Sequence, residues 1–145
     1  MAVERMDHVG IVVDDLAAAI EFFTALGLEP QGDGMIEGDW VDRIVGLDGV
    51  RSEIAMLEAP GGRGKIELVK FHSPAIRAGD REAPSNAAGI RHLCFAVDDL
   101  DATLARLESR GGELVGTIES YSDAYRLCYV RGPEGVIVEL AERLG

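Results

Sequence analysis

An internal repeat of twenty residues constrains this chain more than any other feature of its sequence. The segment His8–Gly27 aligns without a gap with His92–Gly111, at an offset of 84 residues. Seven of the twenty positions are identical, and the identities are of different residue types, so low-complexity composition does not explain them. A repeat of this kind indicates a duplicated structural unit, so the chain is expected to contain two copies of one fold.

Each copy predicts a strand followed by a helix. Apolar residues alternate over positions 9–13 and 93–97, with the period of two that is typical of a strand. An Asp-Asp pair follows in each copy and supplies a helix N-cap with a favourable charge. Apolar residues then recur at helical spacing, at Leu16, Ile20 and Phe23 and again at Leu100, Leu104 and Leu107. Gly27 and Gly111 stand where a helix commonly ends in a left-handed residue.

The remainder of each half is predicted to be rich in strands. Strands are expected at Glu53–Glu58, Lys65–Phe71, Glu113–Ile118, Arg126–Arg131 and Gly135–Ala141. The last two flank the turn Gly-Pro-Glu-Gly and are expected to form a hairpin. The segment Gln31–Gly49 has five glycines and is expected to be a long loop with a short strand or helix.

These elements predict an α+β protein with two tandem βαβββ modules. The whole of residues 1–145 is expected to form one domain, with module 1 at about 5–72, a connector at about 73–88 and module 2 at about 89–143. Each module alone has little mass for a hydrophobic core, so the two are expected to bury their strand faces together.

Charge and cysteine content exclude several classes of function. The chain has 14 Lys and Arg against 26 Asp and Glu, a net charge of −12, which argues against nucleic acid or an anionic membrane as a partner. Two cysteines cannot form a disulfide framework, and reduced thiols in a cytoplasmic protein are the simpler interpretation. The N-terminal sequence does not resemble a signal peptide, and there is no apolar run of membrane-spanning length.

Four polar residues on the predicted strands stand out by their symmetry. His8 and His92 begin the first strand of each half, while Glu67 and Glu139 interrupt otherwise apolar strands. A carboxylate inside a sheet costs free energy unless it is paired or binds a metal. Two imidazoles and two carboxylates suit one divalent ion: Zn, Ni, Co, Mn or Fe(II). Taken singly, a strand His is more often a hydrogen-bonded structural residue, and a strand Glu more often faces solvent.

Segments around these residues resemble the vicinal oxygen chelate superfamily, which includes glyoxalase I, methylmalonyl-CoA epimerase, extradiol dioxygenases and fosfomycin-resistance proteins. The resemblance rests on residues 7–16, 65–69, 90–100 and 132–140. It implies paired βαβββ modules whose curved sheets surround a metal bound by His8, Glu67, His92 and Glu139. An acidic residue at position 67 is similar to the proton-transfer branch, which implies a glyoxalase- or epimerase-like lyase or isomerase with Glu139 or Glu67 as the catalytic base. It also suggests a homodimer and a small-molecule substrate.

Two other functions remain open at this point. A metal-dependent dioxygenase or resistance-type transferase would use only His8, His92 and Glu139 as ligands. A protein that binds a drug-like molecule without chemistry would need no metal. No set of residues resembles a clamp for glutathione, so the sequence indicates neither a glutathione nor a coenzyme A substrate.

Five residues are candidates for contacting the substrate: Arg126, Tyr121, Tyr125, Cys94 and Trp40. Cys94 follows His92 by two residues and so shares its strand face, although a buried structural thiol is the more common case. A guanidinium at position 126 suits a carboxylate or phosphate, but a solvated or ion-paired Arg is at least as common. The two tyrosines can close over a ligand or pack at the rim, and Trp40 can form a pocket wall or a dimer contact.

Overall fold

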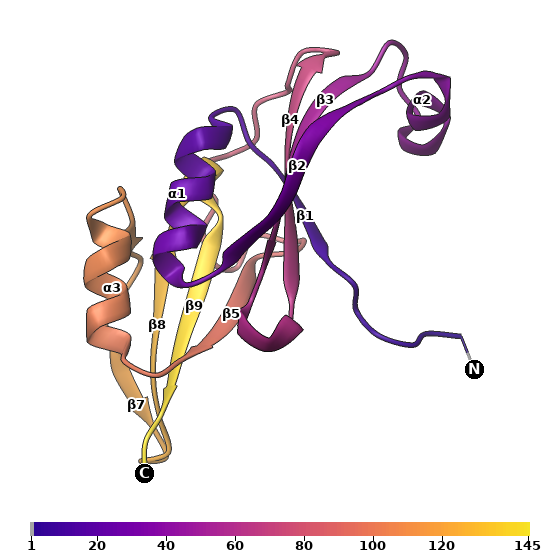
Figure 1. The fold of residues 1–145 in the computed structure, drawn as a ribbon. Coiled ribbons are helices and arrows are strands. Elements are labelled where there is room, and N and C mark those ends of the chain that lie inside the picture. Colours follow the sequence, from indigo (N-terminus) through magenta and orange to yellow (C-terminus); the bar gives the residue numbers. More distant parts are fainter. Residues whose placement is uncertain (1) are drawn as a thin grey trace. The chain divides into compact units, whose positions relative to one another are not determined.

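Both copies of the repeat fold as a strand followed by a helix (Figure 1). The computed structural model describes residues 2–145, and the copies comprise β1 (Val9–Val12) with α1 (Leu16–Leu26), and β5 (His92–Val97) with α3 (Leu100–Glu108). The second Asp of each pair is the N-cap. The side chain of Asp15 accepts a hydrogen bond from the backbone N–H of Ala18, and that of Asp99 accepts one from Ala102, each at 3.0 Å. These bonds satisfy donors that the first turn of a helix leaves unpaired.

The chain divides into two units, residues 1–78 and residues 79–145, and the first holds a four-stranded mixed sheet. Its remaining elements are β2 (Glu29–Glu37), α2 (Asp39–Val45), β3 (Arg51–Glu58), the short helix η1 (Pro60–Gly62) and β4 (Lys65–Ser73). The strand order is β1-β4-β3-β2, with β1 parallel to β4 and the other pairs antiparallel.

The second unit repeats this topology with five strands. Its remaining elements are β6 (Glu113–Leu114), β7 (Glu119–Tyr121), β8 (Tyr125–Arg131), the short helix η2 (Pro133–Gly135) and β9 (Ile137–Arg143). The strand order is β5-β9-β8-β6, β7 also pairs with β8, and β5 is parallel to β9. The predicted α+β class with two βαβββ modules and the predicted hairpin of β8 and β9 are therefore confirmed, with a separate sheet in each unit.

Two segments differ from the prediction. The segment Gln31–Gly49 does contain a short helix, α2, but the long loop expected there is wrong, because β2 extends through residue 37. Its glycines disfavour a strand locally, but pairing along the whole of β3 outweighs that preference. The strand expected at Glu113–Ile118 is only two residues long, and the chain pairs again at β7.

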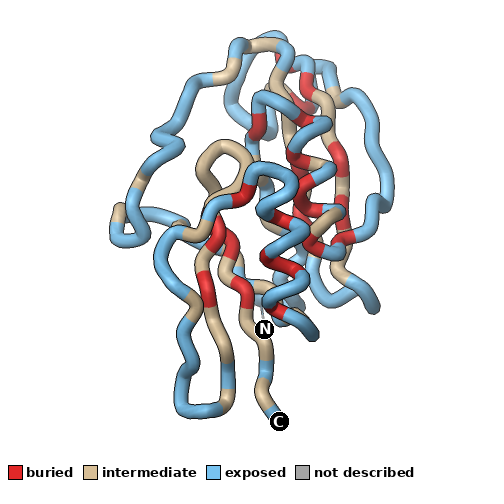
Figure 2. Tube along the Cα trace, turned by 90° about the vertical axis from the view of Figure 1, so that its left-hand side faces the viewer, coloured by how far each residue is buried: buried red, intermediate tan, exposed pale blue. Residues whose placement is uncertain are grey.

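Each unit buries the apolar side of its helix against one face of its sheet, as the red segments of Figure 2 show. In the first unit Phe22 and Phe23 of α1 are buried with Leu57 and Leu68 of the sheet. In the second, α3 contributes the buried residues Leu100, Thr103, Leu104 and Leu107. None of the helices within residues 2–145 has both the length and the apolar character needed to span a bilayer.

Gly112 allows the chain to turn tightly from α3 into the second sheet. Its N–H donates to the carbonyl oxygen of Leu107 at 2.8 Å, and a Cβ at this position would stand 2.8 Å from that same oxygen and 3.0 Å from Cγ1 of Val130. We expect Gly112→Ala to lower the free energy of unfolding by about 1–3 kcal/mol through this overpacking. Urea unfolding followed by circular dichroism measures it.

Gly116→Ala is the matched control, because no heavy atom lies within 4 Å of a Cβ added there. It should leave stability unchanged or slightly raised, since alanine restricts the unfolded chain. Equal unfolding midpoints for the two variants would show that the crowding at Gly112 is relieved without cost.

Candidate metal centre

Glu67 and Glu139 occupy the same position in their two sheets. Glu67 of β4 lies opposite Gly10 of β1, and Glu139 of β9 lies opposite Cys94 of β5. Gly10 and Cys94 are themselves equivalent in the repeat, separated by 84 residues. Because side chains alternate along a strand, His92, which begins β5 two residues before Cys94, lies on the face of Glu139. His8 is predicted to begin the first strand in the same way, but β1 begins at Val9, so His8 directly precedes the strand. Each unit therefore presents a glutamate on the sheet face opposite to the one that its helix covers, and in the second unit His92 lies on that face with it.

In the second unit the imidazole and the carboxylate are in contact. Nε2 of His92 lies 3.2 Å from Oε1 of Glu139. The side chain of Glu139 is 18% exposed and that of His92 is 38% exposed, so the pair is open to a ligand but partly shielded from water. The thiol of Cys94 makes a hydrogen bond to the same carboxylate. The pair therefore brings one nitrogen and one oxygen donor together on this face, and Cys94 lies beside them on the neighbouring strand.

Tyr129 completes the cluster of the second unit from the neighbouring strand β8. It lies directly opposite Glu139 in the β8–β9 register. Its hydroxyl is 3.4 Å from Nδ1 of His92, and the two rings lie 4.9 Å apart. Burial raises the pKa of Tyr129, and the negative charge of Glu139 raises it further. The phenol is therefore neutral at ordinary pH and available as a hydrogen-bonding group.

In the first unit the imidazole has a different neighbour. Nδ1 of His8 lies 2.7 Å from Oδ2 of Asp7, while the guanidinium of Arg5 donates to Oδ1 of Asp7 at 3.1 Å. The hydrogen bond to His8 lowers the pKa of Asp7, and the bond from Arg5 lowers it further. Asp7 is therefore a carboxylate that accepts from both neighbours.

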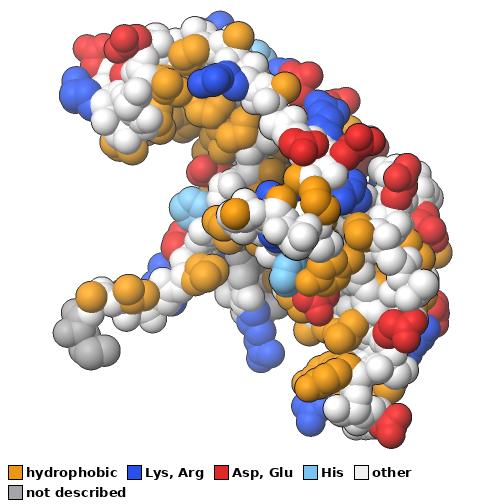
Figure 3. Space-filling view, turned by 180° about the vertical axis from the view of Figure 1, so that it is seen from behind, with side chains coloured by type: hydrophobic (Ala, Val, Ile, Leu, Met, Phe, Trp, Pro, Cys, Tyr) orange, Lys and Arg blue, Asp and Glu red, His pale blue; other side chains and the backbone are white. Residues whose placement is uncertain are grey.

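Apolar side chains surround Glu67 on its sheet. Met56 of β3 lies directly opposite it, and Ile54 and Val69 share the same face by strand alternation. These residues are only partly buried within the unit. Figure 3 shows hydrophobic side chains gathered over the strands of the first unit, in the upper left of the view. A carboxylate in such surroundings is bordered by surface that favours contact with an uncharged group.

The structure joins one of the two predicted His–Glu pairs by a direct contact. Of the four predicted ligands, His92 and Glu139 touch. His8 contacts Asp7 instead, and Glu67 lies opposite Gly10 of β1. Across residues 2–145 no three or more His, Cys, Asp or Glu side chains lie in a geometry that could hold a metal ion. The four-ligand site thus stays a prediction.

Three of the five predicted substrate-contacting residues lie on the face of His92. Cys94 is exposed there, so the alternative of a buried thiol is wrong, whereas Cys128 is buried. Tyr125 shares the face of Tyr129 by alternation along β8, and Tyr121 lies opposite Tyr125. Both tyrosines are exposed.

The other two predicted substrate-contacting residues, Arg126 and Trp40, do not lie on this face. Arg126 is on the helix-covered face of β8, where both of its terminal nitrogens donate to the carboxylate of Asp101 of α3, at 2.8 and 3.1 Å. This pair raises the pKa of Arg126 and lowers that of Asp101. Trp40 lies on α2 of the first unit and is 52% exposed. Arg126 is thus engaged by the helix, as the ion-paired alternative predicts.

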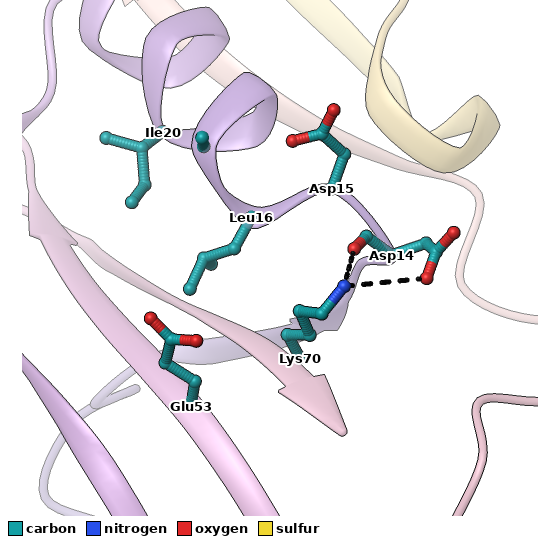
Figure 4. Close-up of a pocket in the computed structure, with 7 residues that line it drawn as sticks. Asp14, Asp15, Leu16, Ile20, Glu53 and Lys70 are labelled. Atoms are coloured by element: carbon teal, nitrogen blue, oxygen red, sulfur yellow. Dashed lines mark hydrogen bonds and ion pairs between the residues drawn. The ribbon is translucent and has the colours of Figure 1, made fainter. Parts of the chain in front are cut away.

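A pocket of the first unit lies on the opposite side of its sheet from Glu67. Its volume is about 540 Å³, and it is lined by Asp14, Asp15, Leu16, Ala17, Ile20, Glu53 and Lys70 (Figure 4). Lys70 stands three residues beyond Glu67 and so points to the other face, where its ammonium donates to the backbone carbonyl of Asp14. This pocket is separate from the His–Glu face.

Sequence reasoning missed Tyr129 and Asp7 as members of the site. The alternation that groups Arg126 with Cys128 and Val130 also places Tyr129 on the other face, which is the signal that identifies it. Asp7 directly precedes His8, but neighbouring residues of an extended chain usually point apart, so sequence alone does not indicate their contact.

The reactivity of Cys94 tests its contact with Glu139. Partial burial of the sulfur raises the pKa of the thiol, and the charge and hydrogen bond of Glu139 raise it further. Since the thiolate is the nucleophile, we expect metal-free protein to react with iodoacetamide at pH 8 several-fold more slowly than free cysteine. Glu139→Gln should speed the reaction, and mass spectrometry of the labelled peptide measures both rates.

Cys94→Ser is the control for this measurement, because the remaining Cys128 is buried and should stay unlabelled in folded protein. A rate that is the same with and without the Glu139 charge would contradict the contact.

Comparisons with known proteins agree with this fold along nearly the whole chain. Residues 5–140 match the family model described as "Glyoxalase/Bleomycin resistance protein/Dioxygenase superfamily". The chain is 32% identical to a 2-epi-5-epi-valiolone epimerase of an Actinomyces species, with 92% of this chain and 76% of that protein covered. It is 30% identical to an ethylmalonyl-CoA/methylmalonyl-CoA epimerase of Cereibacter sphaeroides, with 95% and 97% covered. The crystal structure of a glyoxalase family protein from Bacillus cereus has a TM-score of 0.95 and 45% identity, and covers 100% of this chain and 99% of that one.

Proposed function

Because this chain belongs to the glyoxalase/bleomycin resistance protein/dioxygenase superfamily, we propose that it is a divalent-metal-dependent lyase or isomerase of the epimerase or glyoxalase I type. Its reaction is proton transfer at the carbon next to a carbonyl of a small molecule. The observation that carries this proposal is the contact of Glu139 with His92, together with the equivalent position of Glu67 in the other sheet. Two relatives near 30% identity that are named epimerases support the same class of reaction.

The donor set fits such an ion. Imidazole nitrogen and carboxylate oxygen are ligands that divalent transition metals take in proteins. His92 and Glu139 supply one of each, with Nε2 of His92 3.2 Å from Oε1 of Glu139. His8 and Glu67 would supply the other two protein ligands.

The glutamates are the groups in this chain that are suited to move the proton. An ion held here would polarise the substrate carbonyl and so acidify the neighbouring C–H bond. Glu139 and Glu67 are both partly buried carboxylates on the two sheet faces, and either can accept that proton and return it. The thiol of Cys94 and the hydroxyls of Tyr121 and Tyr125 lie on the Glu139 face and would contact the substrate.

Metal analysis and isotope exchange test this function together. Purified protein should contain, or take up, about one divalent ion per chain, and Glu67→Gln and His92→Ala should each reduce that content. The loaded protein should exchange the α-proton of a 2-oxo hemithioacetal or of a 2-alkylmalonyl thioester in D₂O, followed by NMR. Unchanged metal content in both variants would contradict the site.

The same preparation separates the other two functions. Consumption of oxygen with Fe(II) and a catechol would indicate a dioxygenase instead. Ligand binding that is independent of any metal would indicate a protein that only sequesters its ligand.

A further inference from the structure

We propose that Asp7 is a positioning residue that keeps the proton of His8 on Nδ1 and so presents Nε2 of His8 as the metal-binding nitrogen. The expected effect on metal affinity rests on the proposed function, because it requires His8 to be a metal ligand. The contact between Asp7 and His8 is present without a metal, so the tautomer of His8 can be tested in metal-free protein.

The chemistry of the contact fixes the tautomer. Oδ2 of Asp7 lies 2.7 Å from Nδ1 of His8, the short distance of a charge-assisted hydrogen bond. An ionised carboxylate can only accept, so Nδ1 must carry the hydrogen. A neutral imidazole has one N–H, so its lone pair for a metal is then on Nε2.

Arg5 orients the carboxylate for this task. Its guanidinium donates to Oδ1 of Asp7 at 3.1 Å, which leaves Oδ2 for His8. The three residues Arg5, Asp7 and His8 form a chain of hydrogen bonds along the segment that leads into β1. Their side chains are 69%, 50% and 37% exposed, so the imidazole is the least exposed member.

The second half of the chain contacts the same nitrogen with a different group. The repeat places Gly89 and Arg91 where the first half has Arg5 and Asp7, so no carboxylate precedes His92. There the hydroxyl of Tyr129 lies at Nδ1 of His92, and Nε2 faces Glu139. Both histidines therefore have a partner at Nδ1 that leaves Nε2 free of that contact, although the partner comes from an unrelated position in each half. A second group of this kind commonly orients a histidine ligand and raises its basicity.

Asp7→Ala tests the inference with two readouts. In metal-free protein near pH 8, long-range ¹H–¹⁵N NMR should show His8 protonated at Nδ1 in the unaltered chain. In the variant it should shift towards the Nε2–H form that a free imidazole prefers. The dissociation constant for Zn²⁺ or Co²⁺, measured by competition with a chelating dye, should rise about 10- to 100-fold.

Glu4→Gln is the matched control, because it removes one negative charge from the same exposed segment without contacting His8. An Asp7→Ala protein in which His8 keeps its Nδ1 proton would overturn the inference, as would metal affinity equal to that of Glu4→Gln. If the unaltered protein binds no metal, the proposed function fails, and the tautomer measurement still decides the role of Asp7.

Discussion

Replacing Glu139 with Gln is expected to slow α-proton exchange by about 10²- to 10⁴-fold, the range that a general acid or base contributes. The amide keeps the shape of the side chain but cannot accept the proton, and it lacks the charge that a divalent ion prefers. Glu139 is the carboxylate that contacts His92, so its replacement removes the base that would stand beside the ion in the second unit. Exchange into D₂O by the metal-loaded variant, followed by NMR, measures the effect.

Glu108→Gln is the control for that variant, because Glu108 is an exposed residue at the end of α3. It removes the same charge from the second unit and should exchange at the unaltered rate. Metal content must be determined in parallel, since loss of the ion and loss of the base both slow exchange. A Glu139→Gln enzyme that retains its metal and its full rate would exclude Glu139 as the base and leave Glu67.

Truncation of Phe23 to Ala should destabilise the first unit by about 3–5 kcal/mol, the usual cost of removing a buried aromatic ring. Phe23 is fully buried, and its ring meets that of Phe22 edge to face, with centroids 5.2 Å apart. The loss therefore combines transfer free energy, a cavity and an aromatic pair. The free energy of unfolding in urea, followed by circular dichroism, gives the result.

Trp40→Ala removes a larger ring from the same unit but from an exposed position, so its effect should stay within about 0.5 kcal/mol. If both variants lose little stability, the fold does not rely on the ring of Phe23. If both lose several kcal/mol, Trp40 is covered in solution. A covered Trp40 would support the predicted homodimer, for which this residue is a candidate contact.

The repeat made most of the fold predictable. Leu100, Leu104 and Leu107 are all buried as their spacing predicts, and Asp15 and Asp99 cap their helices. The prediction fails where long-range pairing outweighs local preference. Gly32 and Gly34 lie within a nine-residue strand because β3 supplies its hydrogen bonds, and a partner strand is not visible in the local sequence.

The candidate site could likewise be predicted only in part from the sequence. Strand alternation places Cys94 with His92, and the register adds Glu139 to them, as the symmetry of the repeat suggests. Alternation along β8 also predicts which sheet face carries the side chain of Arg126. Its partner Asp101 is on a helix, however, and only the packed structure shows that contact. The contacts at Nδ1 depend on side-chain rotamers, which no sequence period encodes.

The position of Asp7 on the segment before β1 has a practical consequence for preparing this protein. Residues 2–8 precede the first strand and contribute no side chain to the buried core, so trimming or fusing them should leave the fold intact. An affinity tag, or a truncation that removes the residues before His8, would nevertheless alter the environment of that imidazole. Metal stoichiometry and turnover are therefore best compared on material with an unmodified N-terminal segment.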